Sequence, residues 1–203
     1  MCYMNLGATY EKACTDYAKK TSTEITWKSQ AVFDKEKSCF YLPFYTDELV
    51  VTYPGGQVSF KDREDEVPIA EKILALHYLA DAQGTPVSER WIPFREIPGG
   101  HIYVDPFHGR ALYPLLKNFG KNPDDFEKAA LNLNGKKREM GDISFEIPVF
   151  PMVSLLYILW LGDEEVPASG NILFNESAPD YLPTEDYAII GGLTIGKLKK
   201  ALS

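Results

Sequence analysis

The stretch "IPVFPMVSLLYILWLG", residues 147–162, decides the fold class because it is the most apolar run of the chain. It is shorter than the roughly 20 residues that a membrane-spanning helix needs, and two prolines interrupt it. Its second part, "SLLYILWL", lacks alternating polar residues, which is typical of a central strand covered on both faces. We therefore expect a strand buried in protein, with "ISFEIPVF", residues 143–150, beside it.

Three more strands are expected earlier in the chain. The segments "CFYLPFY", "ELVVTY" and "QVSFK" are rich in aromatic and β-branched residues. The sequence "YPGGQ" joins the last two, and its glycines favour a hairpin turn. The segment "WIPFREIPGGHIYVD", residues 91–105, is expected to be loop and short strand.

Helical signals are grouped apart from these strands. Apolar periodicity and end signals predict helices over residues 5–20, 69–83, 105–120 and 123–134, and a last helix capped by Thr184. Pro114 implies a kink or two short pieces in the third helix. Without regular βαβ alternation, the pattern indicates an α+β fold: a mostly antiparallel sheet with about four to five helices packed on it. We expect a single α+β domain over residues 1–203.

Composition narrows the classes of function. The formal net charge of the 203-residue chain is -8, which argues against binding nucleic acid. The basic cluster "KKR" at 136–138 is expected to be a solvated turn. The N-terminus lacks the pattern of a secretory signal, so we expect a cytoplasmic protein and no membrane partner. The chain has three cysteines, Cys2, Cys14 and Cys39, and no CxxC pair. We expect all three to be free thiols.

Common catalytic motifs are absent from the sequence. It has no phosphate-binding GxxxxGK[ST], no strand-linked GxGxxG, no HExxH and no GxSxG. "GGLTIG", residues 191–196, does not match a dinucleotide-binding pattern. We expect Gly191 and Gly192 to let another element approach the last helix closely, at a cost of roughly 1 kcal/mol each in helix propensity.

The first candidate site is "PGGHIYVDPFHGR", residues 98–110. If it is a strand, His101, Tyr103 and Asp105 point the same way, and His108 and Arg110 follow. Two histidines and an aspartate could bind a metal or form a base with its orienting acid. The alternative is that Asp105 caps a helix and the histidines are structural.

The second candidate site is the acidic stretch "WLGDEEVPASGNILFNESAPDYLPTED", residues 160–186. Between Glu139 and Gly196 the chain has ten acids and no Lys or Arg, so this segment carries a formal charge of -10. Three explanations remain open for these acids. They are exposed loop or helix-end acids, they pair with Arg90, Arg95 or Arg110, or they hold a cation such as Mg²⁺ or Ca²⁺.

Two blocks carry a resemblance to a known family. They are "LALHYLADAQGTPVSERWIPFREIPGGHIYVDPFHGRALYPLLKNFG", residues 74–120, and "LLYILWLGDEEVPASGNILFNESAPDYLPTEDYAIIGGL", residues 155–193. Together they resemble the prokaryotic domain of unknown function 3786, found largely in anaerobic bacteria and archaea. The family has no established activity and so implies no catalytic residues or cofactor. Some relatives carry a cysteine-rich iron-sulfur segment, and this association implies a setting in anaerobic redox or one-carbon metabolism. This chain lacks such a segment.

The preferred hypothesis is a ligand- or partner-binding module, accessory to such metabolism, whose partner is a small molecule or a protein. In this hypothesis, arginines face the acids around Asp163 to Glu165, and aromatic side chains form the walls of the binding pocket. The candidate binding residues are Trp91, Arg95, Glu96, Tyr103, Arg110, Trp160, Asp163 and Glu165.

Two alternatives remain beside it. In the first, the protein is a metal-assisted hydrolase or lyase that polarises water. The candidate metal ligands are Asp105, His108, Asp163, Glu165 and Glu176. In the second, it is a structural subunit of a redox complex, which predicts an exposed apolar patch.

Overall fold

The chain divides into two compact units. The computed structural model describes residues 5–163 and 165–202. The first unit comprises the chain up to Pro86 together with residues 150–152 and 180–182, and the second comprises residues 87–149, 153–179 and those from Pro183 onward. That residues 1–203 behave as one domain stays a prediction.

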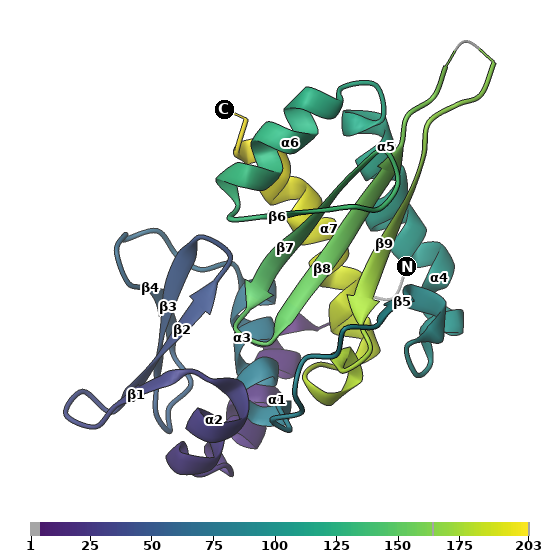
Figure 1. The fold of residues 1–203 in the computed structure, drawn as a ribbon. Coiled ribbons are helices and arrows are strands. Elements are labelled where there is room, and N and C mark those ends of the chain that lie inside the picture. The colour runs from purple at the N-terminus through teal and green to yellow at the C-terminus, as the bar shows by residue number, and fades with distance from the viewer. Residues whose placement is uncertain (1–4, 164, 203) are drawn as a thin grey trace. The chain divides into compact units, whose positions relative to one another are not determined.

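The first unit contains a four-stranded antiparallel sheet (Figure 1). In spatial order its strands are β1 (Val32–Asp34), β2 (Cys39–Phe44), β3 (Asp47–Thr52) and β4 (Val58–Phe60). The three strands expected from the sequence are β2, β3 and β4. The turn between β3 and β4 has Gly56 at a φ of 72°, a conformation that glycine adopts without strain.

Three helices complete this unit: α1 (Leu6–Ala18), α2 (Ser22–Ser29) and α3 (Ile69–Asp81). Aromatic rings fill much of its core. The Tyr17 ring lies edge-on to those of Phe40 and Tyr53, with centroids 6.2 Å and 5.8 Å away. Tyr17 and Phe40 are fully buried, so burial of aromatic surface stabilises the contact between α1 and the sheet.

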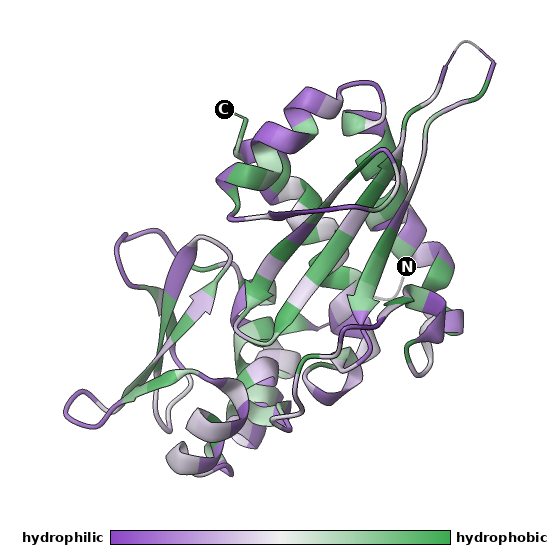
Figure 2. Cartoon of the chain, in the orientation of Figure 1, coloured by the Kyte–Doolittle hydropathy of each residue, from purple (hydrophilic) through white to green (hydrophobic). Residues whose placement is uncertain are grey.

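The second unit contains a five-stranded antiparallel sheet in the order β5-β9-β8-β7-β6. Its strands are β5 (Trp91–Pro93), β6 (Lys136–Arg138), β7 (Ile143–Phe150), β8 (Val153–Trp160) and β9 (Ser169–Asn175). Strand β8 lies in the middle, and residues 155–159 are buried on both faces. This confirms the central strand expected from "SLLYILWL", and its strongly hydrophobic colouring is visible in Figure 2.

Helix α7 (Thr184–Lys200) runs along one face of this sheet (Figure 1). The other helical segments are η1 (Phe94–Glu96), α4 (Gly100–Phe107), the π-helix η2 (His108–Leu112), α5 (Tyr113–Phe119), α6 (Pro123–Asn132) and η3 (Ala178–Asp180). Phe174 of β9 packs against Phe107 and Tyr187, with ring centroids 5.7 Å and 5.3 Å apart. These rings join α4, β9 and α7 in one core.

The α+β class and the antiparallel pairing are confirmed, and three local expectations are wrong. Residues 100–107 form a helix and no strand, so the alternation of side chains assumed for residues 101–105 does not apply. Residues 136–138 form the edge strand β6 and no turn. Thr184 is the first residue of α7 and not its cap; its hydroxyl donates a hydrogen bond to the carbonyl oxygen of Pro98.

The described residues contain seven α-helices, two more than the upper expectation. One of them is α2, in the polar segment 19–30, where the sequence allows a loop or a short helix, and the other arises because η2 separates α4 from α5, in agreement with the two short pieces that Pro114 allows. Within the described residues, no helix combines the length and apolar character that crossing a bilayer requires.

Candidate functional site

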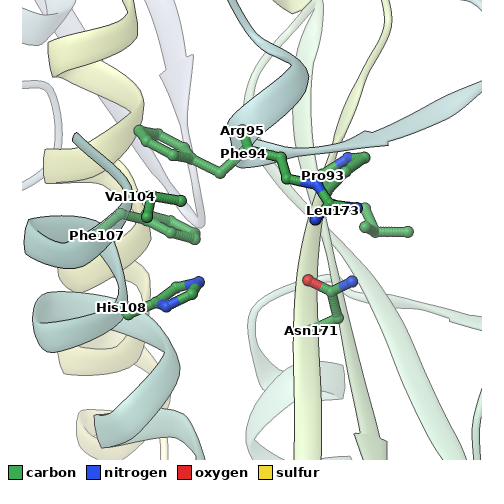
Figure 3. A pocket seen from close by; sticks show the side chains of 8 residues that line it. All are labelled: Pro93, Phe94, Arg95, Val104, Phe107, His108, Asn171 and Leu173. Carbon is green, nitrogen blue, oxygen red and sulfur yellow. The ribbon is translucent and has the colours of Figure 1, made fainter. Parts of the chain in front are cut away.

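A pocket of about 420 Å³ lies in the second unit, between η1, the α4–η2 segment and β9. Figure 3 shows the side chains around it. The residues that line it are Pro93, Phe94, Arg95, Val104, Phe107, His108, Asn171 and Leu173. Five of the eight are apolar, and three carry hydrogen-bonding groups.

The pocket lies where β5 ends. Strand β5 pairs with β9 through three residues only, and its last pair is Pro93 with Leu173. Beyond Pro93 the chain turns into η1, while β9 extends on to Ser169 beside β8. The edge of β9 around Asn171 is therefore left without a β5 neighbour, and the α4–η2 segment closes the space from the other side.

The backbone conformation at the start of α4 explains why residues 99 and 100 are both glycine. Gly99 has a φ of 78°, which favours glycine. A Cβ on Gly100 would lie 2.0 Å from the carbonyl oxygen of Phe94, so no side chain fits there. This close approach lets Phe94 and Phe107 stack, with ring centroids 4.2 Å apart and planes at 5°. The stacked pair forms the apolar floor of the pocket.

The π-helix η2 begins at His108 and sets the position of that residue. Single π turns within helices are rare overall, and those that occur often lie at functional sites. Helix α7 supports the segment from behind, because a Cβ on Gly191 would lie 2.8 Å from Phe107 Cε2 and 3.0 Å from the Ala111 Cβ. The expectation that Gly191 and Gly192 permit close approach of another element is confirmed, since Gly192 also lies against Arg110.

Three polar groups of the pocket have hydrogen-bonding capacity to spare. The imidazole of His108 and the carboxamide of Asn171 face each other across the pocket (Figure 3). Asn171 Oδ1 accepts a hydrogen bond of 2.9 Å from the backbone N–H of Ile172. Within the described residues, the Asn171 Nδ2 donors, the His108 nitrogens and the Arg95 guanidinium make no hydrogen bond or ion pair. Among the residues that the structure describes, no Asp or Glu lines the pocket.

The structure brings two of the sequence-predicted residues to this pocket, Arg95 and His108. Trp91 lies beside it, packed against a cluster that includes the pocket residue Leu173. The signal that was missed is Asn171, the polar residue that directly precedes the apolar part of β9, residues 172–174. Phe94, Val104 and Phe107 gave no signal, because apolar residues in that pattern are typical of any core.

The remaining predicted binding residues lie in other contacts. Tyr103 donates a hydrogen bond to Glu185, which ties α4 to α7, and this contact raises the pKa of the Tyr103 hydroxyl. Glu96 lies 3.9 Å from Arg90. Arg110 is exposed, and neither it nor Arg95 forms an ion pair with a described residue. Trp160 is 41% exposed at the end of β8.

Most of the acids in the acidic stretch have local partners. Glu176 pairs with Arg90 at 2.8 Å, one of the arginines named from the sequence. Asp163 Oδ1 accepts from the backbone N–H groups of Val166 and Glu165, at 2.7 Å and 2.9 Å. These two donors, that of Val166 first, hold the pKa of the Asp163 carboxyl below its usual range.

Two further acids between Glu139 and Gly196 accept hydrogen bonds from protein groups that lie close to them in space. Asp142 Oδ2 accepts from the Leu161 N–H at 2.7 Å, and Asp180 Oδ2 accepts from the Thr85 hydroxyl at 2.7 Å. Glu164 lies outside the described residues. The acids whose partners are seen form hydrogen bonds or ion pairs with protein groups, so no cation is needed to explain their positions.

The metal candidates are distributed over several elements. Asp105 lies exposed on α4, His108 in the pocket, Asp163 and Glu165 in the β8–β9 loop, and Glu176 beside Arg90. Among residues 5–163 and 165–202, no three His, Cys, Asp or Glu side chains are grouped so as to hold a metal ion. Cys14 and Cys39 are free thiols, as expected, and Cys2 lies outside the described range.

A wider hollow, of about 620 Å³, lies in the first unit between α2 and β1. Trp27 and Val32 line it and are 66% and 63% exposed. Its one charged lining residue is Lys35. This hollow is walled mainly by exposed side chains, so the pocket at β9 is the stronger candidate.

A family model described as "Domain of unknown function (DUF3786)" matches residues 22–197. The chain belongs to this family. The match contains every residue of the pocket at β9, and it confirms the resemblance carried by the two sequence blocks. No curated protein and no solved structure matches the chain.

Proposed function

We propose that the protein is a small-molecule-binding module whose ligand occupies the pocket between β9 and the α4–η2 segment. One observation carries the proposal. Arg95, His108 and Asn171 come from three different elements to one apolar-walled space, and their spare hydrogen-bonding groups have no partner among the described residues.

The size and lining of the pocket support this function. Ligand pockets usually measure about 300–1,000 Å³ and combine apolar walls with a few polar groups. Polar groups that lose water without gaining a partner cost about 1–3 kcal/mol each. Since His108 and Asn171 are half-buried, a ligand that displaces water from them must supply their hydrogen-bond partners.

A binding role is favoured over catalysis by the residue types in the pocket. Within the described part of the chain, its lining contains no Ser, Thr, Cys, Lys or carboxylate that could act as a nucleophile or orient His108 as a base. The setting in anaerobic redox or one-carbon metabolism, which the resemblance implies, stays a prediction.

The test fills the pocket and follows binding residue by residue. Benzoate, benzamide and phenyl phosphate are titrated into ¹⁵N-labelled protein, and amide shifts are mapped. We expect at least one probe to shift the amide signals of residues 94, 95, 104, 105, 107, 108 and 171–173 together. The substitution Val104→Trp places a large ring in the pocket and should abolish these shifts.

The matched control is Ile102→Trp on the same helix, where the side chain is 66% exposed. This variant should bind the probes as the unsubstituted protein does. The proposal fails if none of the probes shifts the pocket residues, or if Val104→Trp leaves the shifts unchanged.

A further inference from the structure

We infer that the ligand of this pocket is a small carboxylic acid in its anionic form, with an apolar body that lies against the stacked phenylalanines. The inference rests on the proposed function, because it names the chemical class of the ligand that the pocket takes. Three properties of the lining lead to it: the sign of its charge, the kind of hydrogen-bonding groups it offers, and its apolar share.

The charge of the pocket is opposite to that of the protein. The chain carries a formal charge of -8, yet none of the described acids lines the pocket, and Arg95 places a permanent positive charge there. A cationic ligand would find no counter-charge in the lining. An anion gains the attraction of a guanidinium that has no ion pair to a described residue.

The spare groups of the pocket are mostly donors. A guanidinium has five N–H donors and no acceptor, and an imidazole has at least one donor. The Asn171 carboxamide turns its Oδ1 toward His108 and its Nδ2 away from it (Figure 3), so the donors available to a ligand between them are those of Arg95 and His108. A carboxylate offers acceptors only, and its two oxygens match the planar fork of an arginine.

The apolar share of the lining favours a carboxylate over a phosphate ester. Five of the eight lining residues are apolar, and one residue is permanently charged. A phosphate monoester carries close to two negative charges at neutral pH, and desolvating the second charge beside apolar walls is unfavourable. A single negative charge on an apolar body matches a single arginine.

The experiment compares three planar probes of similar size at neutral pH by calorimetry and by the amide shifts of the pocket residues. Benzoate carries one negative charge, benzamide none, and phenyl phosphate about two. We expect benzoate to bind about tenfold more tightly than benzamide, the factor that one charge-assisted hydrogen bond supplies. Phenyl phosphate should bind more weakly than benzoate.

A pair of arginine variants tests the assigned contact. Arg95→Gln should weaken benzoate binding about tenfold and benzamide binding less, so that the ratio of the two affinities falls, because the charge-assisted contact is lost. Arg110→Gln is the control, because Arg110 is exposed nearby but does not line the pocket. It should leave the affinities for both probes unchanged.

The outcomes separate this inference from the proposed function. If benzamide binds in the pocket as tightly as benzoate, or if Arg95→Gln leaves their ratio unchanged, the carboxylate inference is wrong while the pocket remains a binding site. Tighter binding of phenyl phosphate than of benzoate also overturns it. If no probe shifts the pocket residues, the proposed function and the inference both fall.

Discussion

Gly191 is the residue at which α7 comes closest to the wall of the pocket. The substitution Gly191→Ala places a Cβ within 3.0 Å of Phe107 and Ala111, which are both buried. We expect it to lower the free energy of unfolding by about 1–3 kcal/mol, because a packed core has no room for an added methyl group. Urea denaturation measures the loss.

Gly196 offers a control for this substitution on the same helix. No atom lies within 4 Å of a Cβ built there. Gly196→Ala should therefore raise the free energy of unfolding by about 0.5–1 kcal/mol, as is usual for Ala in place of Gly in an unobstructed helix. Equal effects at the two positions would contradict the close approach of α7.

Asp163 should show a pH dependence with a defined sign. Backbone N–H groups bind its charged form, so its pKa in the folded protein lies below the ordinary value of 3.8. Such a group contributes stability above its unfolded pKa and loses that contribution as the pH falls through its folded pKa. Carbon-detected NMR titration of this carboxyl should give a midpoint below 3.8; a midpoint at or above 3.8 would show that the turn does not form.

Strand β9 contains two asparagines with different roles. Asn175 is buried, and its Oδ1 accepts from the Ser88 N–H at 2.9 Å and from the Ser177 hydroxyl at 2.7 Å. Its Nδ2 donates to the Ser88 carbonyl oxygen. Asn175→Ala should cost about 2–3 kcal/mol of stability in urea denaturation, because it leaves buried backbone groups without partners.

Asn171→Ala is the comparison within the same strand. The Asn171 side chain is half-buried and bonds only to its neighbouring N–H, so its removal should change stability by less than about 1 kcal/mol. This variant should instead weaken binding of benzoate. A large loss of stability at Asn171, or none at Asn175, would reverse the roles assigned here.

Strands and helices with a clear local pattern were predictable from the sequence. The uniform apolar run of β8 and the Pro-Gly-Gly turn before β4 are examples, because burial on both faces and turn chemistry leave a direct signature. Helix α4 was not predictable in this way. Ile102, Tyr103 and Val104 favour strands by propensity, and the contact of Gly100 with the Phe94 carbonyl, which allows the helix, joins residues six apart.

The candidate site was predictable only in part for a similar reason. The sequence pointed to Arg95 as a polar residue in an aromatic-rich loop, and to His108 as a possible metal ligand or base beside Asp105. Their meeting with Asn171 depends on how far β5 extends along β9, which is a long-range register that local patterns do not encode. The sequence suggested that Arg95 and Arg110 pair with the acids. Asp163 and Asp142 instead accept hydrogen bonds from backbone N–H groups that lie near them.

At the scale of the whole chain, the two units should unfold together. Residues 150–152 and 180–182 belong to the first unit although residues of the second unit flank them in sequence. Phe150, the last residue of β7, stacks on Tyr78 with ring centroids 4.5 Å apart. Because β7 ends in the core of the first unit, loss of that core should release the strand.

NMR in increasing urea tests this coupling. Amide signals from β2 and β3 and those from β8 and β9 should lose intensity at one common midpoint. Two distinct midpoints would show that the chain contains two independently folding domains, and the prediction of a single domain over residues 1–203 would then be wrong.

The short β5 strand has one more consequence, which concerns amide hydrogen exchange. The Ile172 N–H lies beyond the pairing with β5 and is bonded to the Asn171 side chain. A bond of this kind opens whenever the side chain changes rotamer, so this amide should exchange with deuterium faster than its neighbours in β9. A ligand that fixes Asn171 should slow exchange at this one amide, and the protein would then report occupancy of the pocket through its own backbone.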